Sequence, residues 1–213
     1  MTCAICGKRP AKRFCPPKGE KICAICCGEG RETTIDCPLD CSYLAAAHRY
    51  EAEHRKQPPP GEMPYRDVSF PVEFVYEHWP IVALLGSTIL GFHAQNKDLH
   101  DRAIFNTLAA LAETYRTLTG GILYERPPDL APARELYGSI QQTLTEFRQK
   151  ESERAGFPVL KDSSVFQLLV FMLRMGKSES NGRPLSRAFL DFLRARFPLP
   201  ASTPQETSRI IVP

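Results

Sequence analysis

The sequence predicts a small zinc-stapled N-terminal module followed by an all-α helical bundle domain. All eight cysteines fall within the first 41 residues, and residues 42–213 contain none. From about residue 71 onward, apolar residues recur at the three- and four-residue spacing of amphipathic helices. With 213 residues, of which 43% are hydrophobic, the chain can bury one core of ordinary size and carry a small appendage.

Four segments follow from this division. Consecutive prolines in "QPPPGEMP" lack amide hydrogens and favour an extended conformation, so the domain boundary is expected there. We predict a cysteine-rich zinc finger with a trailing helix over 1–56, a Pro-rich linker over 57–66, an all-α helical domain over 67–197, and a disordered tail over 198–213.

The position of the cysteines bears on the cellular compartment. No basic region followed by an apolar run precedes Cys3, so we expect no secretory signal and a cytoplasmic protein. In a reducing cytoplasm, clustered cysteines indicate metal binding rather than disulfides. The longest apolar run, residues 81–92, is far shorter than the roughly 20 residues that span a bilayer, so no membrane association is expected.

Two cysteine pairs have the Cys-x-x-Cys spacing of zinc knuckles. They are Cys3 with Cys6 and Cys23 with Cys26. Gly7 and Gly28 follow them at places where a tight turn lets backbone amides point at sulfur. Four such thiolates suit the tetrahedral coordination of Zn²⁺.

A third pair, Cys37 and Cys41, has a different spacing. The segment that follows, rich in alanine and long charged residues, is predicted to be a helix with Pro38 at its first position. In that case the i, i+4 spacing would place both sulfurs on one face of the first turn, where the helix dipole favours thiolate.

Eight sulfurs divide into two sets of four, so two structural zinc ions are expected. The first set is Cys3, Cys6, Cys23 and Cys26, and the second is Cys15, Cys27, Cys37 and Cys41. If the segment around Cys26 and Cys27 is extended, the two adjacent side chains point to opposite sides and join the two sites in a cross-brace. An exchange of Cys26 with Cys27, or replacement of one cysteine by His48, remains open.

This cysteine pattern resembles a known class of module. The run from Cys3 through Cys15 to Cys26 is similar to the front of a B-box zinc finger, with MYND and HIT fingers similar in compactness and ligand number. The resemblance covers about 45 residues and implies a fold with two zinc ions in a cross-brace. The chain departs from the B-box pattern at Lys18, which stands at a ligand position, at the additional Cys27, and in closing with cysteines rather than histidines.

Beyond the linker, several helices are expected. Two are nearly all apolar, over residues 81–92 and 163–175, the latter with Asp162 and Ser163 as candidate caps. Amphipathic stripes predict further helices over 98–119, around 136–147 and over 185–197. Two apolar helices surrounded by amphipathic ones predict a bundle.

Polar clusters outside the cysteine pattern lack a catalytic arrangement. We expect solvated cap and loop residues at His93, Asp98, His100 and Asp101. The exposed face of the trailing helix is expected to carry His48, Glu51 and His54, and residues 176–187 to form a plain helix connection. Because no nucleophile, paired-carboxylate or dinucleotide motif is present, we expect no enzyme.

The expected function is therefore binding. Closed four-cysteine sites are structural rather than catalytic, so we predict a zinc-binding adaptor or regulatory protein with a protein partner. The alternative is nucleic-acid binding through the basic run Lys8 to Lys21. The formal net charge of +3 gives this alternative little support, because eight thiolates and two Zn²⁺ ions would lower it to −1.

Overall fold

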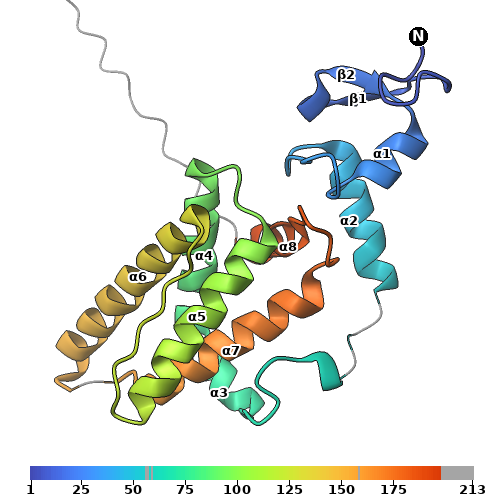
Figure 1. Cartoon of the computed structure of the whole chain (residues 1–213). Helices are drawn as coiled ribbons and strands as arrows, with labels where there is room; N and C mark the ends of the chain where they lie inside the picture. Colours follow the sequence, from blue (N-terminus) through green and yellow to red (C-terminus); the bar gives the residue numbers. More distant parts are fainter. Residues whose placement is uncertain (56–57, 59, 158, 198–213) are drawn as a thin grey trace, which may run out of the picture.

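The computed structural model describes residues 1–55, 58, 60–157 and 159–197, and it confirms the predicted fold class. A small N-terminal module with a two-stranded sheet and a four-cysteine cluster precedes a bundle of helices (Figure 1). The predicted tail, 198–213, and residues 57 and 59 of the predicted linker lie outside the described residues.

The N-terminal module begins with a β-hairpin that the sequence did not predict. Strand β1 (Arg13–Cys15) pairs antiparallel with β2 (Glu20–Ile22). Between them lies the 3₁₀ turn η1 (Pro16–Lys18), which ends at Gly19 with a φ of 65°. Strands of three residues are too short to show an alternating pattern, which explains why the hairpin was missed.

Two helices complete the module, α1 (Ala24–Gly30) and α2 (Ser42–His54). The prediction that α2 starts at Pro38 is wrong, because Cys41 is its N-cap and Cys37 lies in the preceding loop. A helix starting at Pro38 would need the Cys37 carbonyl to accept from the Cys41 N–H. That carbonyl instead accepts from the Arg187 guanidinium at 3.0 Å, while the Cys41 N–H donates to the Pro38 carbonyl.

The bundle contains the predicted helices and one additional short helix. They are α3 (Val72–Glu77), α4 (Trp79–Gln95), α5 (Asp101–Thr119), α6 (Ala131–Ala155), α7 (Asp162–Glu179) and α8 (Ala188–Arg196). A short 3₁₀ turn, η2 (Pro60–Glu62), precedes them. Helix α7 begins directly at Asp162, which therefore occupies the first turn rather than the cap.

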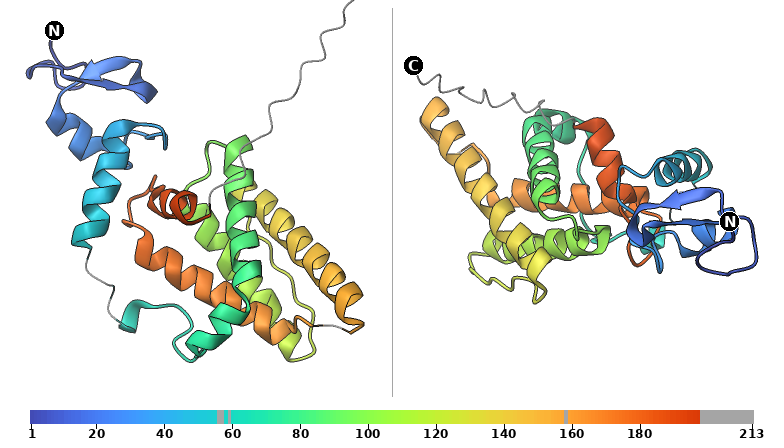
Figure 2. Two further views of the ribbon diagram at one scale, coloured as in Figure 1. Left: turned by 180° about the vertical axis from the view of Figure 1, so that it is seen from behind. Right: turned by 90° about the horizontal axis from the view of Figure 1, so that it is seen from above.

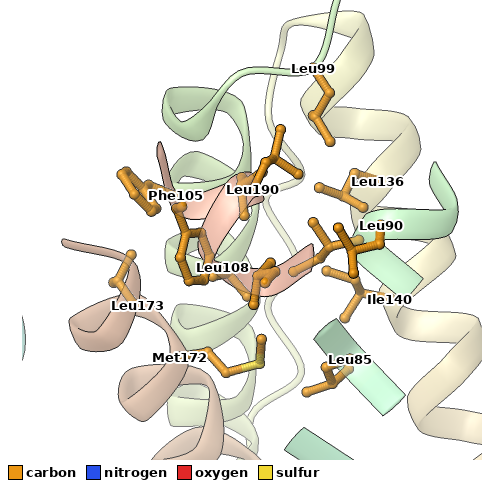
Figure 3. Packing of buried hydrophobic residues seen from close by; sticks show 14 of the residues in the cluster. Leu85, Leu90, Leu99, Phe105, Leu108, Leu136, Ile140, Met172, Leu173 and Leu190 are labelled. Carbon is orange, nitrogen blue, oxygen red and sulfur yellow. The ribbon is translucent and has the colours of Figure 1, made fainter. Parts of the chain in front are cut away.

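The core lies where α5 meets α7, α6 and α8 (Figure 3). Leu108, Ile140 and Met172 have no exposed surface and come from α5, α6 and α7. Helix α4 contributes Leu85 and Ile89, also fully buried. The apolar run of α4 is therefore used inside the bundle, and within the described ranges we find no helix with the length and apolarity to cross a bilayer.

The N-terminal module contacts the bundle beside α8. Both views of Figure 2 show α1 and α2 on the side of the bundle where α8 lies. Helix α2 packs against α8, and the Leu185 N–H donates to the Glu32 carbonyl at 2.9 Å. The two parts thus share a contact surface across the predicted boundary.

Candidate metal centre and its attachment to the bundle

Four thiols come together in the N-terminal module. The sulfur atoms of Cys3, Cys6, Cys23 and Cys26 all lie within 4.8 Å of one another. All eight cysteines are free thiols. Chain segments on both sides of the hairpin supply these sulfurs: Cys3 and Cys6 precede β1, and Cys23 follows β2 directly. We call this group the first cysteine cluster.

Backbone amides stabilise thiolate in this cluster. The Cys23 N–H donates to the Cys3 sulfur at 3.2 Å, and the Cys26 N–H donates to the Cys23 sulfur at 3.4 Å. Burial by itself raises the pKa of Cys3, but amides of Cys6, Cys23 and Ile5 outweigh it and lower that pKa to about 6. Gly7, with a φ of 63°, makes the turn that follows the first pair, as predicted.

Thiolates this close together repel one another, so the charge on one thiol disfavours ionisation of its neighbours. A hydrogen bond to Cys23, followed by burial and by Cys6, raises the pKa of Cys26 to about 12. Four thiolates this close together need a cation to become charged at once, and a divalent ion supplies it. The exposed Arg9 guanidinium lies close enough to interact with the Cys23 thiol, and this interaction raises the pKa of Arg9.

The second set of cysteines is buried nearby but is less tightly grouped. Cys15, Cys27 and Cys37 are at most 8% exposed, and Cys41 is half-buried. Burial and then the neighbouring thiols of Cys27 and Cys41 raise the pKa of Cys15, so these groups lie within electrostatic range. Among the described side chains, however, we find no second group of three or more metal-ligating atoms drawn together.

The adjacent Cys26 and Cys27 lie on helix α1, not on an extended segment as predicted. Gly28, expected in a knuckle turn, is also part of this helix. The Cys27 N–H donates to the Cys23 carbonyl at 3.0 Å, which fixes the first helical turn. Neighbouring residues on a helix still point in different directions, so Cys26 belongs to the first cluster while Cys27 does not.

His48 has a structural position that the sequence did not indicate. The prediction that it lies on an exposed helix face is wrong, because its exposed fraction is 6%. Its Nε2 atom lies 3.0 Å from Glu32 Oε1 and its Nδ1 atom 3.1 Å from Asp191 Oδ2. Since both ring nitrogens face carboxylates, His48 joins the module to α8, and neither nitrogen is directed at a metal site.

Glu32 is the centre of this attachment. Its side chain is fully buried and accepts from the Arg187 N–H at 2.7 Å and from Asn181 Nδ2 at 2.7 Å. Its φ of 53° is unusual for a residue with a side chain. Burial acts to raise the pKa of Glu32, but the contact with His48 and these hydrogen bonds lower it overall. The segment 176–187, expected as a plain connection, is therefore part of a buried polar network.

Arg187 forms a second attachment between the two parts. Its guanidinium pairs with Asp36, donates to the Cys37 carbonyl, and donates to the Lys97 carbonyl at 2.6 Å. Only 3% of the residue is exposed. Asp36 also pairs with His100 at 2.9 Å. The module loop is thus tied to both α8 and the segment between α4 and α5.

Asp101 and His100 were expected to be solvated, and that expectation is wrong. Asp101 is 1% exposed and accepts from Ser186 Oγ at 2.6 Å and from the Phe189 N–H at 3.1 Å. The carboxylate therefore caps the N-terminus of α8, where the helix dipole favours negative charge. This cap fixes the segment that carries Arg187.

Comparison with known proteins adds no family assignment. We found no matching family model, no matching curated protein and no matching solved structure. The structure supports a zinc-finger-like module through the first cysteine cluster. The resemblance to B-box, MYND or HIT fingers stays a prediction.

Proposed function

We propose that this protein is a zinc-binding adaptor or regulatory protein whose N-terminal module contacts a partner protein. The observation that carries the proposal is the first cysteine cluster, with four sulfurs within 4.8 Å in a module that exposes apolar side chains. The role is binding rather than catalysis, because four thiolates fill a zinc tetrahedron and leave no position for substrate.

The residues of the first cluster fit zinc. A tetrahedral ion bound to sulfur at about 2.3 Å implies sulfur separations of about 3.8 Å. The thiols therefore need to approach by only a small distance. Bound zinc would offset two of the four thiolate charges and cross-link the chain segments that carry them.

We further propose that Cys15, Cys27, Cys37 and Cys41 hold a second zinc ion. Three of these side chains are buried, and the pKa of Cys37 is raised to about 11 by burial and by Cys41 and Cys15. Thiols buried together in a small module without disulfides fit a metal site better than isolated core positions.

Exposed apolar side chains support a protein partner. Ile5 and Ile25 lie inside the two Cys-x-x-Cys pairs and are 48% and 46% exposed; we call these two side chains the knuckle surface. Phe14 on β1 is 55% exposed. We infer that these side chains contact a partner, because the buried core of a protein interface is apolar and poor in charged residues.

The nucleic-acid alternative has weaker support. Arg9 contacts the Cys23 sulfur, and the Arg13 guanidinium lies 4.8 Å from the Tyr43 ring centre. These two cations of the basic run interact with groups of the module itself, although Arg9 is exposed. We therefore expect weak binding to random duplex at physiological salt, measured by fluorescence anisotropy. A tight complex that is abolished by neutralising Lys8, Arg9, Lys12 and Arg13 would overturn the adaptor proposal.

Metal analysis tests the zinc proposal. We expect two zinc ions per purified chain, with Cys23→Ser losing one ion and Cys41→Ser losing the other. Ser42→Ala, beside Cys41, is the control and should keep both. One ion per chain that survives Cys41→Ser would refute the second site.

A capture experiment tests the protein contact. We expect Ile5→Asp combined with Ile25→Asp to abolish retention of a partner from lysate while zinc content is unchanged. The control Lys8→Gln should retain that partner. Equal retention by all three proteins would show that the knuckle surface is not the contact.

A further inference from the structure

A cleft of about 900 Å³ opens where the N-terminal module meets the bundle. Its walls come from two distant parts of the sequence. The apolar lining residues are Pro16, Pro17, Pro38, Leu39, Leu90 and Ala94. The first four belong to the module and the last two to α4. This volume falls within the range of roughly 300–1,000 Å³ that is usual for small-molecule sites, which often lie at such junctions.

The cleft is held open by hydrogen bonds across its walls. Arg187 donates to the Cys37 carbonyl on the module side and to the Lys97 carbonyl on the bundle side. Arg194 Nη2 donates to the Leu39 carbonyl at 3.3 Å. Prolines in the module wall restrict its backbone further. Because the walls are already fixed, a ligand would bind without the cost of ordering them.

Some charged side chains around the cleft form ion pairs, and others are exposed. Asp36 is engaged by Arg187 and His100, and Arg194 pairs with Asp191. Lys97 is exposed and makes no ion pair within the part of the chain that the structure describes. The acidic residues Asp40 and Asp98 also line the cleft, and both are exposed.

The pKa of His93 is affected by the charged groups at one end of the cleft. Burial, followed by the nearby charges of Lys97, Arg187, His100 and Arg194, lowers the pKa of His93 to about 4. After burial, the groups with the largest effect on this imidazole are cations, and among them Lys97 lines the cleft. The end of the cleft beside α4 favours a negatively charged group.

We propose that this cleft binds a small amphipathic monoanion, with its apolar body over Leu39, Leu90 and Ala94 and its anionic group facing Lys97. The site is separate from the knuckle surface proposed for a partner protein. The module wall of the cleft lies beside Cys15, Cys37 and Cys41 in the sequence, so the test uses the zinc-loaded chain.

Two fluorescent probes with the same ring system test the proposal on the full zinc-loaded chain. Anilinonaphthalene sulfonate carries one negative charge, and N-phenyl-1-naphthylamine carries none. We expect saturable binding of both at one site, with the sulfonate bound more tightly. Lys97→Gln should weaken sulfonate binding about fivefold, the scale of one partly exposed charge interaction. Asp40→Asn should strengthen it, and neither change should alter binding of the neutral probe.

A steric variant locates the bound probe. Ala94 is exposed on α4 and lines the cleft, whereas the adjacent Gln95 is exposed and does not line it. We expect Ala94→Trp to abolish binding of both probes and Gln95→Trp to leave it unchanged, with circular dichroism confirming the fold of each.

Three results would overturn the proposal. The first is an absence of saturable sulfonate binding. The second is equal binding by Ala94→Trp and Gln95→Trp, which would place the probe elsewhere. The third is an equal effect of Lys97→Gln on both probes, which would remove the charge argument. The conservative Lys97 and Asp40 variants keep the test decisive if Ala94→Trp misfolds.

Discussion

The Nε2 atom of His48 lies 3.0 Å from the Oε1 atom of Glu32, and neither side chain is more than 6% exposed. Asp191 of α8 faces the other ring nitrogen, so the imidazole bridges a carboxylate of the module and one of the bundle. A buried charge of this kind is costly when it loses its partner. The attachment between the two parts therefore depends on a few charged residues.

We expect Glu32→Gln to destabilise the chain. The neutral amide would leave protonated His48 with one carboxylate. If the amide oxygen keeps the contacts of Oε1 with His48 and the Arg187 N–H, the NH₂ group replaces Oε2 and faces the donors Asn181 Nδ2 and Arg183. Breaking a buried pair in this way costs about 3–5 kcal/mol. Urea unfolding of the zinc-saturated protein measures the change. Glu29→Gln, at an exposed site on α1, is the matched control and should be neutral.

Stability should fall at alkaline pH because of His48. Burial acts to lower the pKa of His48, but Asp191 and Glu32 outweigh it and raise the value to about 9 from the ordinary 6.5. A raised folded-state pKa contributes stability that is fully present below about pH 6.5 and is lost as the pH rises through about 9. Two further charged groups face this pair: Arg183 lies near Glu32, and Arg194 pairs with Asp191.

The pH experiment compares unfolding free energies of wild type and His48→Asn between pH 6 and 9.5. The difference between them should shrink as the pH rises, because His48 loses its proton. Thiol ionisation affects both proteins alike and cancels in this difference. A constant difference would show that folding does not raise the pKa of His48.

Replacing a helical glycine by alanine should have opposite effects on stability at two positions. A Cβ atom at Gly176 would lie 2.5 Å from Phe105 Cε1 and 3.2 Å from the Phe189 ring. Gly176→Ala should therefore destabilise the α5–α7–α8 contact through overpacking, by about 1–3 kcal/mol. Gly138 on α6 has no atom within 4 Å of the same position, so Gly138→Ala should stabilise by roughly 0.5–1 kcal/mol. Thermal unfolding of both variants checks the contrast.

Zinc removal should weaken the bundle without unfolding it. A chelator would release the module, leaving Arg187 and Asp191 without their partners there, while the core around Leu108 keeps its contacts. We expect the far-ultraviolet helical signal to persist largely unchanged and the melting temperature to fall. Complete loss of helical signal would mean that the two parts fold only together.

Local periodicity was sufficient to predict the bundle. The residues Ile104, Leu108 and Leu111 recur at helical spacing, and all three have no exposed surface on α5. Likewise, the Cys-x-x-Cys spacing predicted the first cluster, because short knuckles bring sulfurs together without distant contacts. These features depend on neighbours a few residues apart.

Contacts between distant residues could not be predicted in this way. His48 and Asp191 are 143 residues apart, and Glu32 is 155 residues from Arg187. A polar residue that pairs across such a separation has the same local pattern as a solvated one. Cys37 is a second example, because its carbonyl accepts a hydrogen bond from the distant Arg187 instead of the helical bond that was predicted.

The separation between Glu32 and Arg187 also constrains the order of events during synthesis. The ribosome delivers the N-terminal cysteines long before the segment that supplies the partners of Glu32. If the nascent module binds zinc at this stage, it does so while Glu32 and His48 are still hydrated and unpaired with α8. The module can dock on the bundle only after α8 has been synthesised. A translation product truncated before α8 would therefore leave Glu32 and His48 exposed to water.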